Sequence, residues 1–230
     1  MLPPLYPSDS KELEIRNLGI VSYDKALDIQ ADLIVRRRSG EVPDQLILLE
    51  HPHVITMGTG SNVDHVLADQ ELRAQLGIEL YETSRGGDVT YHGPGQLVGY
   101  PILDLKPDRM DLLAYLRDLE TVLIESLEEI GIHVKKISGL TGVWVEDRKI
   151  AAIGVRVSSG WITSHGFSLN VNSDLSYYEN IIPCGIAGCS VTSISEELGK
   201  TIEIKDVLPI VCKYFENAFK RHIRVGGPTN

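Results

Sequence analysis

Three stretches of the chain carry apolar residues at helical spacing. Residues 23–34 place an apolar side chain every three or four positions, and the pattern stops at Gly40. A stripe of leucines over residues 112–130 ends at Gly131, and a third stripe occupies residues 207–218. Each pattern predicts an amphipathic helix with one face in the core.

Strand patterns lie between these predicted helices. Residues 46–49 form a short apolar run typical of a buried strand. Residues 142–171 are rich in β-branched side chains, with turn sequences at 146–148 and 158–160, which predicts an antiparallel meander. A capping box at residues 193–196 opens a short helix that ends at Gly199. The chain is therefore predicted to be α+β, with a mixed and largely antiparallel sheet.

Length and composition fit a single domain. The chain has 230 residues, of which 43% are hydrophobic, enough for a full core. We predict a flexible arm over residues 1–12, one folded domain over 13–224 and a flexible tail over 225–230. Met1–Ser10 lacks an apolar run long enough for a signal peptide or a membrane span, so we expect a soluble cytoplasmic protein. The net charge of −10 argues against nucleic acid or an acidic membrane as a general partner.

Metal and nucleotide motifs are absent from the sequence. Cys184, Cys189 and Cys212 lack zinc-type spacing and build no disulfide framework. His51 and His53 have no third ligand signalled nearby. There is no phosphate-binding loop, no dinucleotide fingerprint and no serine-hydrolase elbow. We therefore predict neither a metal nor a cofactor.

The segment 84–100 is the strongest functional signal. It holds five glycines, together with Arg85, His92 and two tyrosines, between two apolar runs. Glycine is tolerated at this density where backbone must adopt positive φ or approach a ligand closely. Strands on either side of residues 92–95 would place His92 at a strand end facing a cavity. The competing interpretation is a structural Gly-Pro-Gly turn.

Two further residues have the character of a reactive pair. Cys184 lies between Pro183 and Gly185, which presents its thiol on a turn, although a buried cysteine is more often a small apolar side chain. Strand alternation puts Lys149 on the apolar face of its strand, where it either extends to water or remains partly desolvated beside a thiol. In the second case, the lysine ammonium would lower the pKa of the neighbouring thiol. His165, followed by glycine as His92 is, is either pocket lining or structural.

These motifs together resemble the lipoyl(octanoyl) transferase family over roughly residues 13–215. The resemblance rests on segments 85–101, 149–156, 165–167, 182–186 and 191–193. It implies the fold of biotin and lipoate protein ligase catalytic domains and an acyltransferase that needs no cofactor. It also implies octanoyl-acyl carrier protein as donor, with lipoyl domains of 2-oxoacid dehydrogenase E2 subunits and the glycine cleavage H protein as acceptors.

The resemblance also assigns roles to single residues. Cys184 would carry the octanoyl group as a thioester, and Lys149 would lower the pKa of that thiol and move protons. The substrate site would be lined by three segments, namely Arg85, Gly86, Gly87, Asp88, Val89, Thr90, Tyr91 and His92, then Ala152, Ile153 and Gly154, then His165, Gly166 and Phe167. Two alternatives stay open: an ATP-dependent lipoate or biotin protein ligase, and a non-catalytic protein that binds acyl carriers or lipoyl domains.

Overall fold

The structure is a computed structural model that describes residues 4–183 and 190–224. Cys184 and Cys189 lie outside the described residues. The helices are α1 (Tyr23–Arg38), α2 (Gln70–Leu76), α3 (Leu112–Ile130), α4 (Ile194–Leu198) and α5 (Ile204–Phe219), with 3-10 helices η1 (Val63–His65) and η2 (Leu175–Asn180). The strands are β1 (Glu12–Ile20), β2 (Asp44–Glu50), β3 (Val54–Met57), β4 (Glu79–Glu82), β5 (Val89–His92), β6 (Gln96–Ile102), β7 (Lys135–Ile137), β8 (Leu140–Val145), β9 (Arg148–Val157), β10 (Thr163–Asn170), β11 (Ser190–Val191) and β12 (His222–Arg224).

The strands form two sheets. In the main sheet the order is β12-β1-β2-β6-β10-β9-β8-β7, and β11 pairs with β9. Its neighbours are antiparallel except β1 with β12, β1 with β2, and β9 with β11. A small sheet has the order β4-β3-β5. The prediction of a mixed, largely antiparallel sheet flanked by helices is confirmed.

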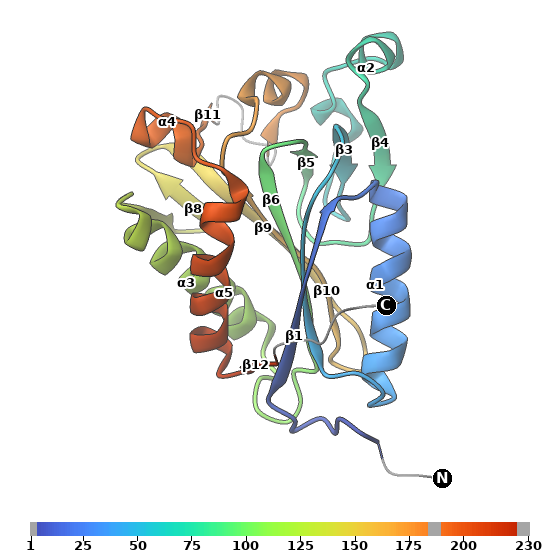
Figure 1. The fold of residues 1–230 in the computed structure, drawn as a ribbon. Coiled ribbons are helices and arrows are strands. Elements are labelled where there is room, and N and C mark those ends of the chain that lie inside the picture. The colour runs from blue at the N-terminus through green and yellow to red at the C-terminus, as the bar shows by residue number, and fades with distance from the viewer. Residues whose placement is uncertain (1–3, 184–189, 225–230) are drawn as a thin grey trace.

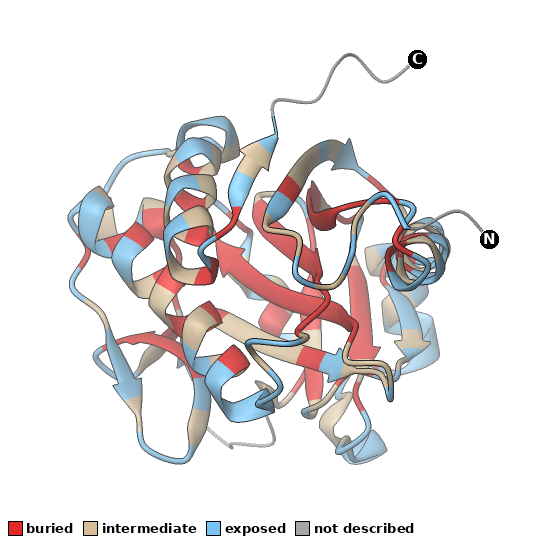
Figure 2. Ribbon diagram, turned by 90° about the horizontal axis from the view of Figure 1, so that it is seen from below, coloured by how far each residue is buried: buried red, intermediate tan, exposed pale blue. Residues whose placement is uncertain are grey.

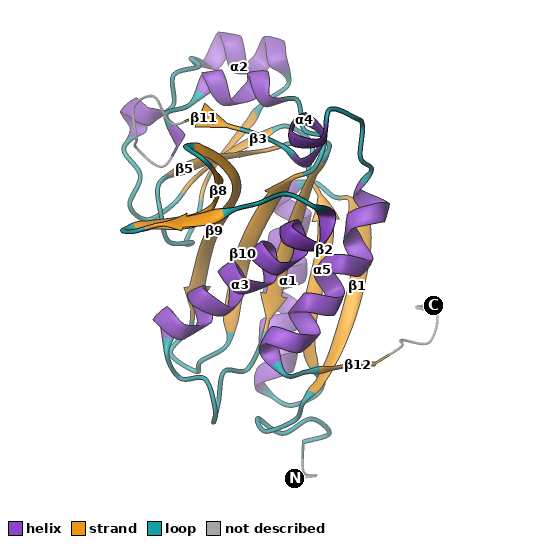
Figure 3. Ribbon diagram, turned by 90° about the vertical axis from the view of Figure 1, so that its left-hand side faces the viewer, coloured by secondary structure: helices purple, strands orange, loops and turns teal. Residues whose placement is uncertain are grey.

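Helices cover both faces of the main sheet. Figure 1 shows α3 and α5 on one face and α1 on the other, and Figure 3 shows α3 and α5 in front of the strands. Successive side chains of β2 enter different cores: Leu46 and Leu48 pack with α3 and α5, whereas Ile47 and Leu49 pack with α1. The strands between the helices are accordingly buried, as Figure 2 shows.

The helices and strands predicted from sequence are present at the expected places. Ser193 accepts a hydrogen bond from the Glu196 amide at the start of α4, as the capping box predicts. α3 ends at Gly131, whose φ of +94° places it in the left-handed region. At the N-terminal end β1 begins at Glu12, and the Tyr6 amide donates to the Gly40 carbonyl at 2.9 Å.

The glycine-rich segment passes from one sheet to the other. β5 belongs to the small sheet, β6 belongs to the main sheet, and Gly93–Gly95 connects them. Gly95 has a φ of +81°, and a Cβ there would lie 2.4 Å from Asn172 Oδ1. Its amide donates to Glu50 at the end of β2. Glycine is therefore required for the turn that places His92 between the two sheets.

A buried cluster of charges joins segments that are far apart in sequence. Asp44, at the start of β2, accepts hydrogen bonds at 2.7 Å from the Nε atoms of both Arg37 and Arg221. It also accepts from the Asp104 amide at 2.9 Å. All three charged side chains are at most 1% exposed. One carboxylate thus connects the end of α1, the strand after it, the loop after β6 and the segment that follows α5.

We expect Asp44→Asn to destabilise the fold by about 3–5 kcal/mol, because it leaves two buried guanidinium groups without their counter-charge. Urea unfolding measures this change. Asp32→Asn is the matched control, since Asp32 is 63% exposed in its ion pair with Arg36 and its loss should cost less than about 1 kcal/mol. Equal losses in the two variants would contradict the structural role of the cluster.

Candidate functional site

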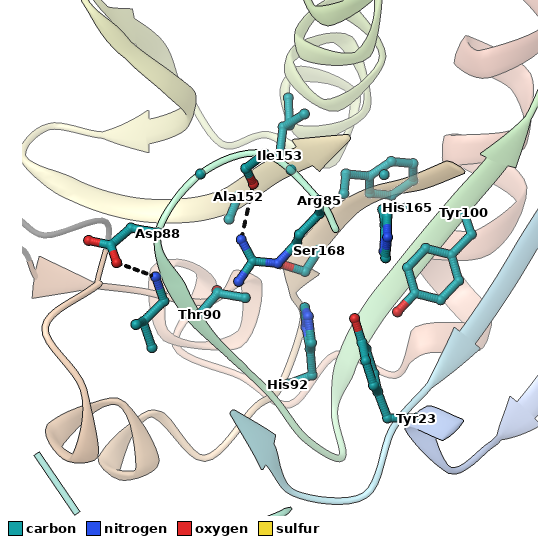
Figure 4. Close-up of a pocket in the computed structure, with 16 residues that line it drawn as sticks. Tyr23, Arg85, Asp88, Thr90, His92, Tyr100, Ala152, Ile153, His165 and Ser168 are labelled. Carbon is teal, nitrogen blue, oxygen red and sulfur yellow. Dashed lines mark hydrogen bonds between the residues drawn. The ribbon is translucent and has the colours of Figure 1, made fainter. Parts of the chain in front are cut away.

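A cavity of about 60 Å³ lies where the two sheets meet (Figure 4). We call it the central cavity. It brings together nearly all the substrate-site residues predicted from sequence, with three that were not predicted. It is lined by Tyr23, Arg85, Gly86, Gly87, Asp88, Val89, Thr90, His92, Tyr100, Ala152, Ile153, Gly154, His165, Gly166, Phe167 and Ser168.

Tyr91 is the predicted lining residue that the structure places elsewhere. Side chains alternate along β5, so Thr90 and His92 line the cavity while Tyr91 enters the core of the small sheet. There its hydroxyl bonds to His53 Nδ1 at 2.7 Å, and burial raises its pKa. Tyr91 thus belongs to the core of the small sheet and is not part of the lining of the central cavity.

Arg85 anchors the loop that forms one wall. Its guanidinium donates to Thr56 Oγ1 from Nε at 3.1 Å and to the Thr56 carbonyl from Nη2 at 2.6 Å. A further bond reaches the Gly86 carbonyl at 3.1 Å, which Figure 4 shows. The Gly86 amide donates to the Val155 carbonyl of β9 at 2.9 Å. The loop is thus held between the small sheet on one side and β9 on the other.

Close backbone contact explains two glycines around this loop. A Cβ on Gly154 would lie 3.0 Å from the Gly86 carbonyl oxygen, and one on Gly58 would lie 2.2 Å from that of Gly87. Any side chain at these positions would displace the loop from the strand or from the small sheet. Close approach of one backbone segment to another is the reason for glycine at both positions.

Three neutral histidines lie in or beside the cavity. Burial lowers the pKa of His51 and of His165 to about 4. Burial, with a smaller contribution from His51, lowers the pKa of His92 to about 3. Arg85 lowers the pKa of His92 and His165 further through its positive charge. All three rings are therefore uncharged near neutral pH, and Arg85 supplies positive charge to the cavity wall.

Tyr23, Tyr100 and Ser168 were missed by sequence reasoning. Ser168 follows the predicted Gly166 at the spacing of a strand face, so period-two alternation could have found it. Tyr100 ends the glycine-rich segment, and its hydroxyl donates to His51 Nε2 at 2.7 Å. Tyr23 begins α1, and no local signal connects it with a site more than sixty residues away in the sequence.

Lys149 lies between two further cavities. The inner cavity is lined by Thr90, Lys149, Ile150, Ala151, Ala152, Asn170, Tyr178, Pro183 and Val191. The outer cavity, of about 300 Å³, is lined by Gly86, Gly87, Asp88, Leu112, Leu116, Gly139, Leu140, Thr141, Lys149, Ile153, Gly154 and Val155. Thr90 and Ala152 are common to the inner and central cavities, so the three spaces adjoin.

The burial of Lys149 decides between its two interpretations. The residue is only 5% exposed, and Nζ lies 4.7 Å from the ring centre of Trp144 on β8, a cation–π contact. The lysine therefore leans inward, and the alternative in which it extends to water is wrong. A desolvated amine on a rigid strand beside a cavity is a group suited to proton transfer.

Of the three cysteines, Cys212 lies within the described residues. Cys184, predicted as the nucleophile, and Cys189 lie outside the described residues. Pro183, which precedes Cys184, lines the inner cavity together with Lys149. Cys212 is half-buried in α5, where burial raises the pKa of its thiol to about 11 and so disfavours the nucleophilic thiolate.

The histidines weighed as metal ligands have other partners. His51 donates from Nδ1 to the Val21 carbonyl at 2.6 Å and accepts from Tyr100, while His53 bonds to Tyr91 and stacks on Tyr177. Within residues 4–183 and 190–224, no cluster of three or more histidine, cysteine or acidic side chains is arranged to hold a metal ion. In the same residues, no helix combines the length and apolar character needed to cross a membrane.

Solved structures with the same fold are catalytic domains of protein ligases. Lipoate-protein ligase A bound with ATP superposes with a TM-score of 0.76 at 16% identity, covering 95% of this chain and 90% of that one. A bipartite lipoate protein ligase from Thermoplasma acidophilum gives 0.71 at 16% identity, with 94% and 88% covered. Biotin protein ligase from Aquifex aeolicus gives 0.54 at 19% identity, with 91% and 71% covered. The fold class is thus that of lipoate and biotin protein ligase catalytic domains, as predicted.

Sequence relatives narrow this class. The family of the lipoyl protein ligase A/B catalytic domain matches residues 22–216. The octanoyltransferase of Koribacter versatilis is 46% identical over 216 residues, covering 92% of this chain and 86% of the relative. Those of Solibacter usitatus and Rubrobacter xylanophilus are 49% and 50% identical, covering 89% and 85% of this chain and 92% and 88% of the relatives. The chain belongs to the octanoyltransferase family, whose members are acyltransferases.

Because of the buried histidines, we expect the free energy of unfolding to fall in mild acid. Each has a folded pKa below the unfolded value of about 6.5, so its contribution to stability is complete above pH 6.5 and is lost as the pH falls toward 4. Each group contributes a slope of up to about 1.4 kcal/mol per pH unit in this window. Urea unfolding between pH 8 and pH 5 measures the total slope.

His165→Asn removes one of these groups and suits the backbone there, since His165 has a φ of +55° that asparagine tolerates. The stability of this variant should fall less steeply with acid than that of the wild type. Identical slopes for the two proteins would show that His165 is not a source of the acid sensitivity.

Proposed function

We propose that this protein transfers an octanoyl group from octanoyl-acyl carrier protein to a lysine of lipoyl domains, through a thioester on Cys184. The acceptors are the lipoyl domains of 2-oxoacid dehydrogenase E2 subunits and the glycine cleavage H protein. The observation that carries the proposal is that buried Lys149 shares the inner cavity with Pro183, the residue before Cys184. The octanoyltransferases at 46–50% identity support the acyl group.

In the first half of the reaction the Cys184 thiolate attacks the carbonyl carbon of the donor thioester. A new C–S bond to Cys184 forms, the C–S bond to the carrier breaks, and the released carrier thiolate takes a proton from the Lys149 ammonium, which leaves Lys149 as the neutral amine. Lys149 supports this step because its ammonium stabilises the Cys184 thiolate. One thioester replaces another, so the exchange is nearly balanced and needs no ATP.

In the second half the neutral amine of the acceptor lysine attacks the same carbonyl carbon. A C–N bond forms, the C–S bond to Cys184 breaks, and the amine loses a proton to the basic form of Lys149 while Cys184 departs as thiolate. The amide product is more stable than the thioester, which makes this half favourable. A group that changes its protonation state between two half-reactions has to be close to both reacting atoms.

The central cavity is the proposed substrate site. Its wall on β9 includes Ala152, whose side chain is a single methyl group. The inner cavity, which Lys149 lines, adjoins this space at Thr90 and Ala152. We place the reaction in the cytoplasm, where reducing conditions keep cysteine thiols free.

Mixing the protein with octanoyl-acyl carrier protein, followed by an acid quench and intact mass measurement, tests the thioester. We expect a mass increase of one octanoyl group that hydroxylamine removes. Cys184→Ala should abolish the adduct, whereas Cys212→Ala, the control in α5, should retain it. Absence of any adduct in the wild type, with octanoate ligation and ATP–pyrophosphate exchange instead, would assign the protein to the ATP-dependent ligases.

Lys149→Met tests the proposed electrostatic role, because methionine retains an unbranched side chain against Trp144 without the charge. The pH dependence of Cys184 alkylation by iodoacetamide should move upward toward the ordinary thiol pKa of about 8.5. Acyl transfer at pH 7 should fall by about 10²–10⁴-fold, as for loss of a positioned acid–base group. An unchanged alkylation profile would exclude activation of Cys184 by Lys149.

A further inference from the structure

Gln96 is a fully buried amide at the first position of β6, with partners on both sides. Its Oε1 lies 2.6 Å from His92 Nδ1. Its Nε2 lies 2.9 Å from Asn170 Oδ1, 2.9 Å from the Tyr178 hydroxyl and 3.2 Å from the Tyr91 carbonyl. The side chain therefore joins His92 in the central cavity to Asn170 and Tyr178, which line the inner cavity.

These partners determine which end of the Gln96 amide is the oxygen and which is the NH₂ group. The Tyr91 carbonyl only accepts hydrogen bonds, so the atom facing it has to be the NH₂ group. Asn170 is oriented independently, since its Nδ2 donates to the Thr192 carbonyl at 3.0 Å and leaves Oδ1 toward Gln96. Gln96 Oε1 consequently faces His92 and only accepts, which requires the proton on His92 Nδ1.

A neutral imidazole protonated at Nδ1 has a bare lone pair on Nε2. His92 is neutral because burial lowers its pKa to about 3. His51, Arg85 and His165 face the same ring. The positive charge of Arg85 opposes protonation of His92, and a proton on His51 or His165 would oppose it as well. Among the described residues no hydrogen bond reaches Nε2, and Figure 4 shows His92 within the lining of the central cavity beside Tyr23.

We propose that Gln96 is a positioning residue that holds His92 in the Nδ1–H form, so that Nε2 accepts a hydrogen bond from the amine of the acyl acceptor. The inference rests on the proposed function for the identity of that amine. A neutral amine has to direct its lone pair at the carbonyl carbon while its N–H groups find acceptors. A fixed acceptor on a rigid strand orients the amine for this attack.

The role of His92 is distinct from that of Lys149. An imidazole with so low a pKa is a weak base, so it orients the amine rather than taking its proton. Lys149 lines the inner and outer cavities, whereas His92 lines the central one. The attacking nitrogen would then lie beside Thr90 and Ala152, which line both the central and the inner cavity, with His92 on one side of the nitrogen and Lys149, the proton acceptor, on the other.

Long-range ¹H–¹⁵N correlation spectra of protein with labelled histidine test the tautomer without any assay of activity. The His92 signals are assigned by their loss in His92→Gln. We expect a protonated Nδ1 and an unprotonated Nε2 in the wild type, and loss of this preference in Gln96→Leu. A wild-type ring protonated at Nε2, or an unaltered tautomer in a folded Gln96→Leu, would overturn the proposal.

Single-turnover kinetics test the function of the lone pair. The octanoyl-enzyme is isolated and mixed with a lipoyl domain, and its formation from the donor is followed separately. Gln96→Leu should slow transfer to the acceptor by about 10–100-fold while acyl-enzyme forms at the wild-type rate. His92→Gln, which keeps an oxygen acceptor, should retain more transfer than His92→Phe.

Gln45→Leu is the matched control, because Gln45 is equally buried but lies in β2, where its amide contacts Glu14 and Pro43. Its transfer rate should be that of the wild type. Equal slowing of both half-reactions by Gln96→Leu, or of neither, would overturn the role in acceptor positioning. Failure of the wild type to form an acyl-enzyme would instead refute the proposed function, while the tautomer would still be measured.

Discussion

The backbone of residues 85–88 lies in direct contact with β9, and the layout of the site depends on this contact. The Gly86 amide bonds to the Val155 carbonyl, and Gly154 leaves no side chain to keep the two segments apart. Gly86, Gly87 and Asp88 line both the central and the outer cavities, so the loop is the wall between them. Arg85 holds this wall to the small sheet through Thr56. Movement of one short loop would therefore merge or close two of the three cavities.

The polar groups around the cavities are expensive to bury, and three of them have partners that offset part of the cost. Lys149 lies against Trp144, Gln96 is satisfied at both ends of its amide, and Arg85 donates to Thr56 and Gly86. Buried polar groups left without partners cost far more than those in a connected network. The histidines meet the same cost differently, because they remain neutral. The site thus retains positive charge at Arg85 and Lys149 while its rings serve as uncharged hydrogen-bonding groups.

The sequence predicts the main architecture because the long elements carry strong patterns. The helices at 112–130 and 207–218 have a strong apolar face, and the meander has clear turns. The helix at 23–34 has a weaker apolar face, because Gln30 is among its buried residues. The small sheet has no such signal, since β3, β4 and β5 are four residues long and β4 is largely exposed. The small sheet is visible only through tertiary contacts, and these contacts place Tyr91 in its core. In a strand of four residues, the sequence does not show which side chains face the cavity. That depends on the second core, which lies behind the strand.

The site shows the same division between what is local and what is assembled. Motif residues such as Arg85, His92 and Gly154 can be named from sequence, because their glycine-rich surroundings are local. The direction of each hydrogen bond cannot be predicted from sequence, because groups on other strands determine which atom donates. The Thr192 carbonyl fixes the orientation of the Asn170 amide on β10, and Asn170 fixes that of the Gln96 amide. Gln96 in turn fixes which nitrogen of His92 carries the proton. Thr192 also donates its amide to the Lys149 carbonyl. The network that orients His92 therefore runs from β5 of the small sheet, through Gln96 and Asn170 of the main sheet, to the strand that carries Lys149. Hydrogen bonds across the two sheets thus connect the two groups.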